Sequence, residues 1–146
     1  MHARYTLKQA NEALKLVRVI ADEMLERRRE RRGLAVRRDQ LERANTPEGL
    51  RKELAELDAR IWELDEALLR CKLELEELGL KILRPNPLTI HIPGCHDRAV
   101  AAVEDQERDE DELLFCWQEG EAEVSFGHPS GEDGLPRRPL RVARGA

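Results

Sequence analysis

The side chains best suited to chemistry lie in the C-terminal half of the chain. They are imidazoles, thiols and one carboxylate: His91, Cys95, His96, Cys116, Glu121 and His128. Imidazole and thiolate are good zinc ligands, and the ends of strands could bring such residues together. However, their spacing matches no recognised ligand pair, and a cysteine in an apolar strand is more often an inert small hydrophobe. We therefore expect no metal and no cofactor.

A smaller polar group is a candidate site for an anion or a carboxylate. It consists of Glu121, His128 and Arg137. The simpler interpretation is that these residues form hydrogen bonds in turns and hairpins. The sequence contains no glycine-rich phosphate loop, no nucleophile motif and no paired carboxylates beside them. It therefore leans away from an enzyme, although a small-molecule or metal-dependent enzyme at this end of the chain stays an alternative.

An arginine-rich block is the second candidate site. Its members are Arg27, Arg28, Arg31, Arg32, Arg37 and Arg38. On a helix these side chains would wrap around the axis, and no aromatic residue lies among them for stacking on bases. Pairing with acidic residues of a neighbouring helix is the simpler interpretation, and binding of nucleic-acid phosphates is the alternative. Docking of the acidic segment 104–112 on this block is a third hypothesis, based on charge alone.

The composition restricts the class of protein. Of the 146 residues, 38% are charged and only 3% are aromatic, so leucine-rich helical packing must bury most of the apolar surface. The net charge of −5 gives no general attraction for nucleic acid. The sequence has no secretory signal and no apolar run of the ~20 residues that a membrane span needs. We therefore expect free cysteines, a cytoplasmic location and no membrane partner.

The stretch from Thr46 to Gly79 predicts one long helix. Its apolar residues repeat with gaps that alternate between four and three, which is the pattern of a coiled-coil seam. The seam consists of Leu50, Leu54, Leu57, Ile61, Leu64, Leu68, Cys71, Leu75 and Leu78. Thr46 and Pro47 are suited to the start of the helix, and Gly79 is suited to a Schellman motif at its end.

An earlier helix begins at a capping box formed by Thr6 and Gln9. If the chain turns back near residue 45, the numbers of paired seam residues add to 91 or 92, as for Leu34 and Leu57. This constant sum favours an antiparallel helical hairpin over residues 1–79. In the competing interpretation, the first helix ends at Arg32, Gly33 terminates it, and a loop follows.

Residues 80–146 predict a small β-rich part with an acidic loop and an irregular tail. Residues 80–83 and 88–92 have the pattern of short strands. Residues 113–117 and 121–126 predict a hairpin around Gly120. The expected fold is α+β, with a long antiparallel helical hairpin followed by a small antiparallel sheet.

Trp62 lies one position beyond the seam and indicates a second contact surface on the helix, either against the small sheet or against a second hairpin. Two hairpins that pack as a four-helix dimer would cover it. The leading interpretation is therefore a non-enzymatic, self-associating coiled-coil module that acts in interaction or scaffolding as a homodimer.

Several short motifs follow one another along nearly the whole chain. They are Tyr5-Thr6-Leu7 with Ala10-Asn11, then Leu78-Gly79, Leu113 to Trp117 with Gly120-Glu121, His128, and Arg137-Arg138-Pro139-Leu140. This order resembles a bacterial family known as domain of unknown function 2203. The chain differs from the family pattern at His91, where the family tends to be acidic, at Gly127, where it is usually aromatic, and over residues 95–112. The resemblance implies a shared fold and no particular activity.

Overall fold

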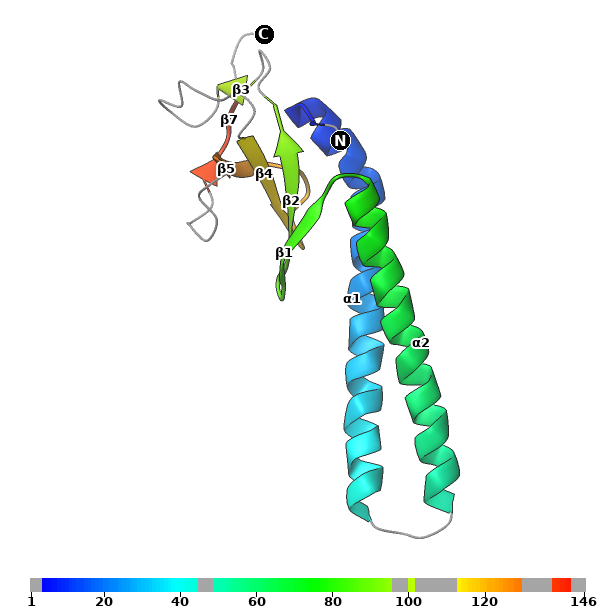
Figure 1. The fold of residues 1–146 in the computed structure, drawn as a ribbon. Coiled ribbons are helices and arrows are strands. Elements are labelled where there is room, and N and C mark those ends of the chain that lie inside the picture. Colours follow the sequence, from blue (N-terminus) through cyan, green and yellow to red (C-terminus); the bar gives the residue numbers. More distant parts are fainter. Residues whose placement is uncertain (1–3, 45–48, 96–99, 102–112, 130–137, 143–146) are drawn as a thin grey trace. The chain divides into compact units, whose positions relative to one another are not determined.

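The computed structural model describes residues 4–44, 49–95, 100–101, 113–129 and 138–142 (Figure 1). Its helices are α1 (Leu7–Ala44) and α2 (Gly49–Glu77). Its strands are β1 (Lys81–Pro85), β2 (Leu88–Gly94), β3 (Val100–Ala101), β4 (Leu113–Gln118), β5 (Phe126–Pro129), β6 (Arg138–Pro139) and β7 (Arg141–Val142). The chain divides into two compact units, Met1–Val19 with Leu75–Ala146, and Ile20–Glu74. Each unit is described by itself.

Helix α1 begins at the predicted capping box. The backbone N–H of Thr6 donates to Oε1 of Gln9 at 3.0 Å, and the N–H of Gln9 donates to Oγ1 of Thr6 at 3.1 Å. The helix then continues through Gly33 to Ala44. The loop interpretation is therefore wrong, because the ~1 kcal/mol penalty of one glycine is too small to end a helix of this length.

Helix α2 ends in the predicted Schellman motif. Gly79 has a φ of 83°, and its N–H donates to the carbonyl of Glu76 at 2.9 Å. The N–H of Leu80 donates to the carbonyl of Leu75 at 3.0 Å. Both bonds satisfy carbonyls that a helix end would otherwise leave unpaired. The predicted start of the helix at Thr46 and Pro47 lies outside the described residues.

In the unit Ile20–Glu74, α1 and α2 run side by side as the predicted antiparallel hairpin (Figure 1). The apolar side chains that this unit buries are Ile20, Ala21 and Met24 of α1 and Leu64, Ala67 and Cys71 of α2. Ion pairs join Arg60 to Glu30 and Arg31 to Asp65 across the two helices. The residue numbers of these two pairs add to 90 and to 96, on either side of the 91 or 92 predicted for paired seam residues.

The other unit contains an antiparallel sheet with the strand order β1-β2-β4-β5-β6. Strands β2 and β4 form its centre, where Ile90 pairs with Trp117 and His91 pairs with Cys116. Strands β3 and β7 form a separate two-stranded sheet. The predicted α+β class and the small antiparallel sheet are confirmed. Strands β6 and β7 lie within the stretch that we expected to be an irregular tail.

The sheet buries its apolar residues together with the first turns of α1. Ala10, Leu14 and Val17 of the helix are buried, as are Ile90 of β2 and Phe115 of β4. A parallel bridge between Tyr5 and Gly94 ties the start of the chain to β2. A Cβ at Gly94 would lie 2.8 Å from the Phe115 ring, so this position requires glycine.

The prediction of a strand over residues 121–126 is wrong for residues 121–125. Strand β5 begins at Phe126, which pairs with Cys116. The preceding segment is held by side chains instead of by a strand ladder. Nε1 of Trp117 donates to the carbonyl of Glu121 at 3.0 Å, and Oδ1 of Asn11 accepts from the N–H of Val124 at 2.7 Å. These bonds compete with strand pairing for the same backbone groups.

Candidate functional site

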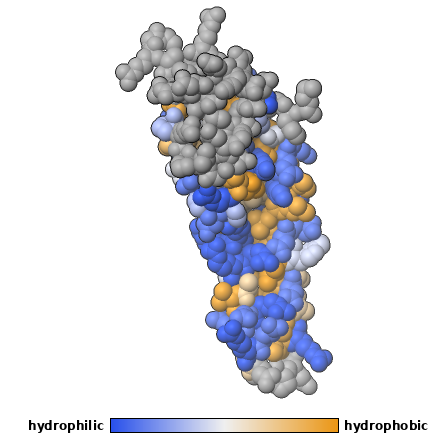
Figure 2. Space-filling view, turned by 60° about the vertical axis from the view of Figure 1, so that its left-hand side comes forward, coloured by the Kyte–Doolittle hydropathy of each residue, from blue (hydrophilic) through white to orange (hydrophobic). Residues whose placement is uncertain are grey.

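An apolar stripe runs along α2 on the side that the hairpin leaves uncovered. We call it the outer stripe; it consists of Ala55, Ala59, Trp62, Glu66, Leu69 and Leu73. These residues follow one another with gaps of four and three, so they share one helix face as a second heptad seam. Trp62 is 64% exposed, Leu69 49% and Leu73 47%. Figure 2 shows, on one face of the molecule, apolar surface interrupting the charged surface along the helices.

The exposure of these large apolar side chains indicates a contact surface because the residues are regularly spaced along one helix face. Scattered exposed apolar residues are normal on soluble proteins, whereas a regular series on one helix face is typical of contact with another helix. The single polar member, Glu66, is half-buried. The outer stripe has the spacing by which one amphipathic helix recognises another.

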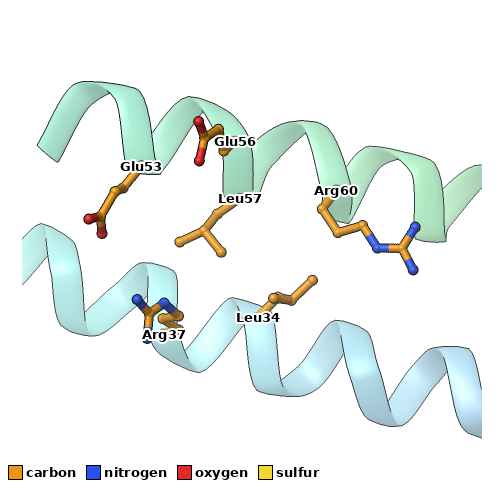
Figure 3. A pocket seen from close by; sticks show the side chains of 6 residues that line it. All are labelled: Leu34, Arg37, Glu53, Glu56, Leu57 and Arg60. Carbon is orange, nitrogen blue, oxygen red and sulfur yellow. The ribbon is translucent and has the colours of Figure 1, made fainter. Parts of the chain in front are cut away.

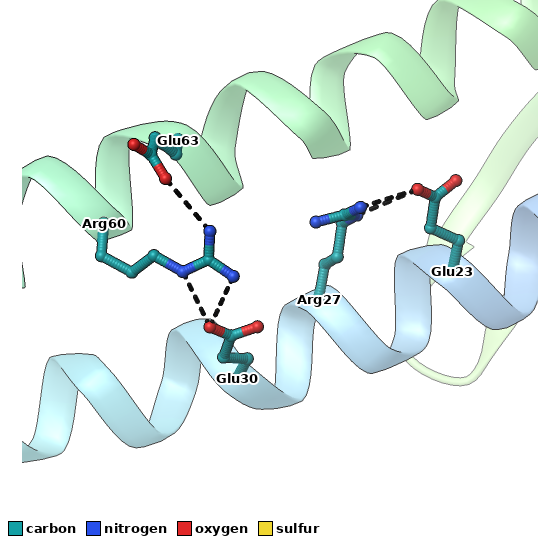
Figure 4. A network of polar contacts seen from close by, with 5 residues as sticks. All are labelled: Glu23, Arg27, Glu30, Arg60 and Glu63. Atoms are coloured by element: carbon teal, nitrogen blue, oxygen red, sulfur yellow. Dashed lines mark hydrogen bonds and ion pairs between the residues drawn. The ribbon is translucent and has the colours of Figure 1, made fainter.

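A network of charged side chains links the two helices on the inner side. Arg60 of α2 donates to Glu30 of α1 and to Glu63 one turn further along its own helix (Figure 4). On α1, Arg27 donates from two nitrogens to Glu23, at 3.1 and 2.9 Å. These side chains are 33 to 60% exposed, so each pair contributes roughly 0.2–1 kcal/mol.

Half of the predicted basic block takes part in such pairs. Arg31 pairs with Asp65 and Arg38 pairs with Asp58, both across the hairpin. The hydrogen bond from Arg38 lowers the pKa of Asp58 below its usual range. Arg27 is held by Glu23, and Arg28 also has an interaction partner. Two members of the block remain at the exposed surface of α1: Arg32 and Arg37.

An open groove lies between the helices further along the hairpin. It has a volume of about 380 Å³, and its lining residues are Leu34, Arg37, Glu53, Glu56, Leu57 and Arg60. Figure 3 shows Leu34 and Leu57 pointing toward each other between the helices, with charged side chains around them. Both leucines are half-buried, so the inner seam is less tightly closed here than around Leu64.

The thiol of Cys71 is buried and lies against Glu23, the carboxylate that pairs with Arg27. Its Sγ donates to Oε2 of Glu23 at 3.4 Å. Burial and this carboxylate raise the pKa of Cys71 to about 11. A thiol with such a pKa is protonated at neutral pH and is a poor nucleophile and a poor metal ligand.

Of the residues that we considered for chemistry, the structure describes the side chains of His91, Cys95, Cys116 and Glu121. Oε1 of Glu121 accepts from the N–H of Gln118 at 2.8 Å and so stabilises the turn after β4. His91 and Cys116 are buried neighbours on β2 and β4. His128 pairs with Leu114 along β5, and Arg137 and His96 lie outside the described residues, as does the segment 104–112. The described residues contain no group of three potential metal ligands.

Sequence reasoning missed several residues that the structure uses. Leu69 and Leu73 extend the surface that Trp62 alone indicated, and the signal was a second series of alternating gaps displaced by two positions from the seam. Asn11 and Glu119 were also missed. Oε1 of Glu119 accepts from the N–H of Leu88 at 2.6 Å, across 31 residues of sequence, and no local pattern announces such a bond.

With the fold in place, comparison with known proteins defines the class. The sequence profile of the family described as "Uncharacterized conserved protein (DUF2203)" matches residues 4–140. The chain therefore belongs to this family, as its motifs predicted. No curated protein and no solved structure matches the chain significantly. In the part of the chain that the structure describes, neither helix has an apolar stretch long enough to cross a membrane.

Proposed function

We propose that this protein is a non-enzymatic interaction module that self-associates through its helical hairpin and acts as a scaffold. The observation that carries the proposal is the outer stripe of α2, where Trp62, Leu69 and Leu73 are each about half exposed or more. Tryptophan is enriched at the centres of protein interfaces because it buries a large apolar area at low entropic cost. A second copy of the hairpin would cover this stripe as a coiled coil.

The charged groups of the hairpin support binding of a protein more than binding of nucleic acid. Three members of the arginine block already pair with carboxylates: Arg27, Arg31 and Arg38. To bind phosphates, these arginines would first have to break their ion pairs. Arg32 and Arg37 alone offer few contacts to a phosphate backbone, where affinity grows with each phosphate neutralised.

The test is light scattering coupled to gel filtration over a hundredfold range of protein concentration. We expect a dimer that persists in ~0.5 M salt, because burial of apolar surface is not screened. The variant Trp62→Glu should shift the protein toward monomer, since it places an unpaired charge in the contact. Val36→Glu is the matched control, because Val36 is 53% exposed and lies on α1, away from the outer stripe.

Two outcomes would overturn the proposal. The first is a monomer at every concentration. The second is a peak whose absorbance ratio at 260 and 280 nm reveals nucleic acid that salt removes, which would favour the arginine block as the functional surface. Circular dichroism of each variant separates loss of association from loss of folding.

A further inference from the structure

The charges that border the outer stripe are arranged with opposite signs along the helix. Glu63 directly follows Trp62, and Arg70 directly follows Leu69. On the other border, Asp65 directly precedes Glu66, and Lys72 directly precedes Leu73. Both borders are therefore acidic toward the N-terminal end and basic toward the C-terminal end.

We propose that two copies of α2 pack antiparallel on each other through the outer stripe, with the two-fold axis between Ala67 and Leu68. This inference rests on the proposed self-association and adds its geometry. In this register Trp62 faces Leu73 of the second copy, and Glu66 faces Leu69 of the second copy. Two of the three large exposed side chains of the stripe, Trp62 and Leu73, then cover each other, and Leu69 packs against the half-buried Glu66.

The same register pairs the four charges that border the stripe between Trp62 and Leu73 with their opposites. In antiparallel helix pairs, residues on one border of a seam meet residues on the same border of the partner. Glu63 therefore meets Arg70 of the second copy, and Asp65 meets Lys72 of the second copy. The two-fold axis repeats both contacts, so one interface contains four attractive pairs.

Other arrangements of the same two helices bring like charges together. A parallel pair in register would place Glu66 against Glu66 of the second copy inside the seam. An antiparallel pair displaced by one heptad toward the N-terminus would place Glu63 against its own copy, and Asp65 likewise. Like charges at such positions destabilise a helix pair, so the charge pattern selects one orientation and one register.

The contacts within the chain are compatible with this pairing. Glu63 is held by Arg60 at 3.1 Å, and its side chain is 60% exposed (Figure 4). Asp65 is held by Arg31 and is 49% exposed. Carboxylates with this exposure can accept a second cation, and charges that form a network contribute more to stability than isolated surface pairs do.

The test is a charge-reversal cycle measured as the dissociation constant of the full-length dimer by sedimentation. Glu63→Arg and Arg70→Glu should each weaken the dimer about tenfold, because each turns two attractive contacts into repulsive ones. The double variant should return to within about threefold of the wild type. Raising the salt to ~0.5 M should reduce the effect of each single variant.

Matched controls reverse the same charges on the outer side of α1. Glu26→Arg and Arg29→Glu change the net charge equally at exposed positions outside the stripe, and they should leave the dissociation constant unchanged.

Failure of the register and failure of self-association give different results. A wild-type dimer that Trp62→Glu disrupts, but in which the two charge reversals do not compensate each other, would overturn the antiparallel register and leave the proposed function standing. A monomeric wild type would overturn both. Dimer loss with the controls as well as the test variants would mean that net charge, and not pairing, sets the association.

Discussion

Oδ1 of Asn11 accepts a hydrogen bond from the backbone N–H of Val124, with 2.7 Å between oxygen and nitrogen. Residues 113 positions apart in the sequence are joined by this contact, and Val124 is only 2% exposed. A second bond, from Nδ2 of Asn11 to the carbonyl of Leu7 at 3.1 Å, fixes the amide on the helix. Together with the bond from Trp117 to Glu121, this side chain therefore holds the segment before β5 in place of a strand ladder.

Removing this acceptor should destabilise the protein. Asn11→Ala leaves a buried N–H without a partner, which costs about 1–3 kcal/mol of the free energy of unfolding. Asn11→Asp keeps an oxygen for the Val124 N–H and should cost less. Urea denaturation of the two variants measures the difference, and equal losses would show that the bond contributes nothing.

Two glycines should respond in opposite directions to the same substitution. Gly94→Ala would place a Cβ 2.8 Å from the Phe115 ring, and Phe115 is fully buried. We expect a loss of about 1–3 kcal/mol in the free energy of unfolding. Gly33→Ala meets nothing within 4 Å and should instead stabilise α1 by about 0.5–1 kcal/mol.

Thermal denaturation of these alanine variants and of Gly94→Ala combined with Phe115→Leu checks the cause. If overpacking is responsible, the smaller side chain at 115 should make the Gly94 substitution less costly. A Gly94→Ala protein as stable as the wild type would contradict the close packing.

The buried thiol of Cys71 should be nearly inert. Its pKa of about 11, compared with 9.0 for an ordinary thiol, means about a hundredfold less thiolate at pH 8. Alkylation followed by mass spectrometry should modify the half-buried Cys95 first. Equal modification of Cys71 and Cys95 in the folded protein would contradict its burial.

The same pKa shift predicts a loss of stability at high pH. The unfolded thiol ionises near its ordinary value of 9.0, whereas the folded thiol ionises near 11. The contribution of Cys71 to stability is therefore complete below pH 9 and falls as pH rises toward 11. A Cys71→Ala protein should lack this part of the alkaline loss, as denaturant titrations at pH 8 and pH 10.5 would reveal.

Acid should weaken the hairpin through Asp58. Its pKa lies below the ordinary 3.8 because Arg38 donates a hydrogen bond to the ionised form. This stability is present above pH 3.8 and is lost as the pH falls through the lower folded value. Between pH 6 and pH 3, Asp58→Asn should lose less stability than the wild type, while the exposed control Asp22→Asn should lose as much.

The architecture could be predicted from the sequence wherever the determinants are local or periodic. Thr6 and Gln9 define the start of α1, and Gly79 defines the end of α2, because each motif spans a few residues. The hairpin followed from the spacing of leucines. Where the sequence failed, the determinants were distant. Ala122, Val124 and Phe126 alternate like a strand, yet Asn11 takes the Val124 N–H out of any ladder.

The candidate site was predicted in part. Trp62 stood out because it is a large residue one position beyond the seam. Leu69 and Leu73 were less visible, because Leu68 and Cys71 of the seam lie beside them and a leucine-rich helix hides a second series within the first. Glu121 was singled out for chemistry, and in the structure its Oε1 accepts from the N–H of Gln118. Sequence alone does not distinguish a carboxylate that binds a ligand from one that binds a backbone N–H.

The C-terminal end of α2 depends on the chirality of the residue at position 79. At Gly79, φ is 83°, a region that costs L-residues energy and that the mirror-image residues prefer. A chemically synthesised chain with D-alanine at position 79 should therefore fold at least as well as the natural one, whereas L-alanine should fray the helix end. Among the residues that the ribosome incorporates, glycine fits this position best because it is achiral and adopts a positive φ without a steric penalty.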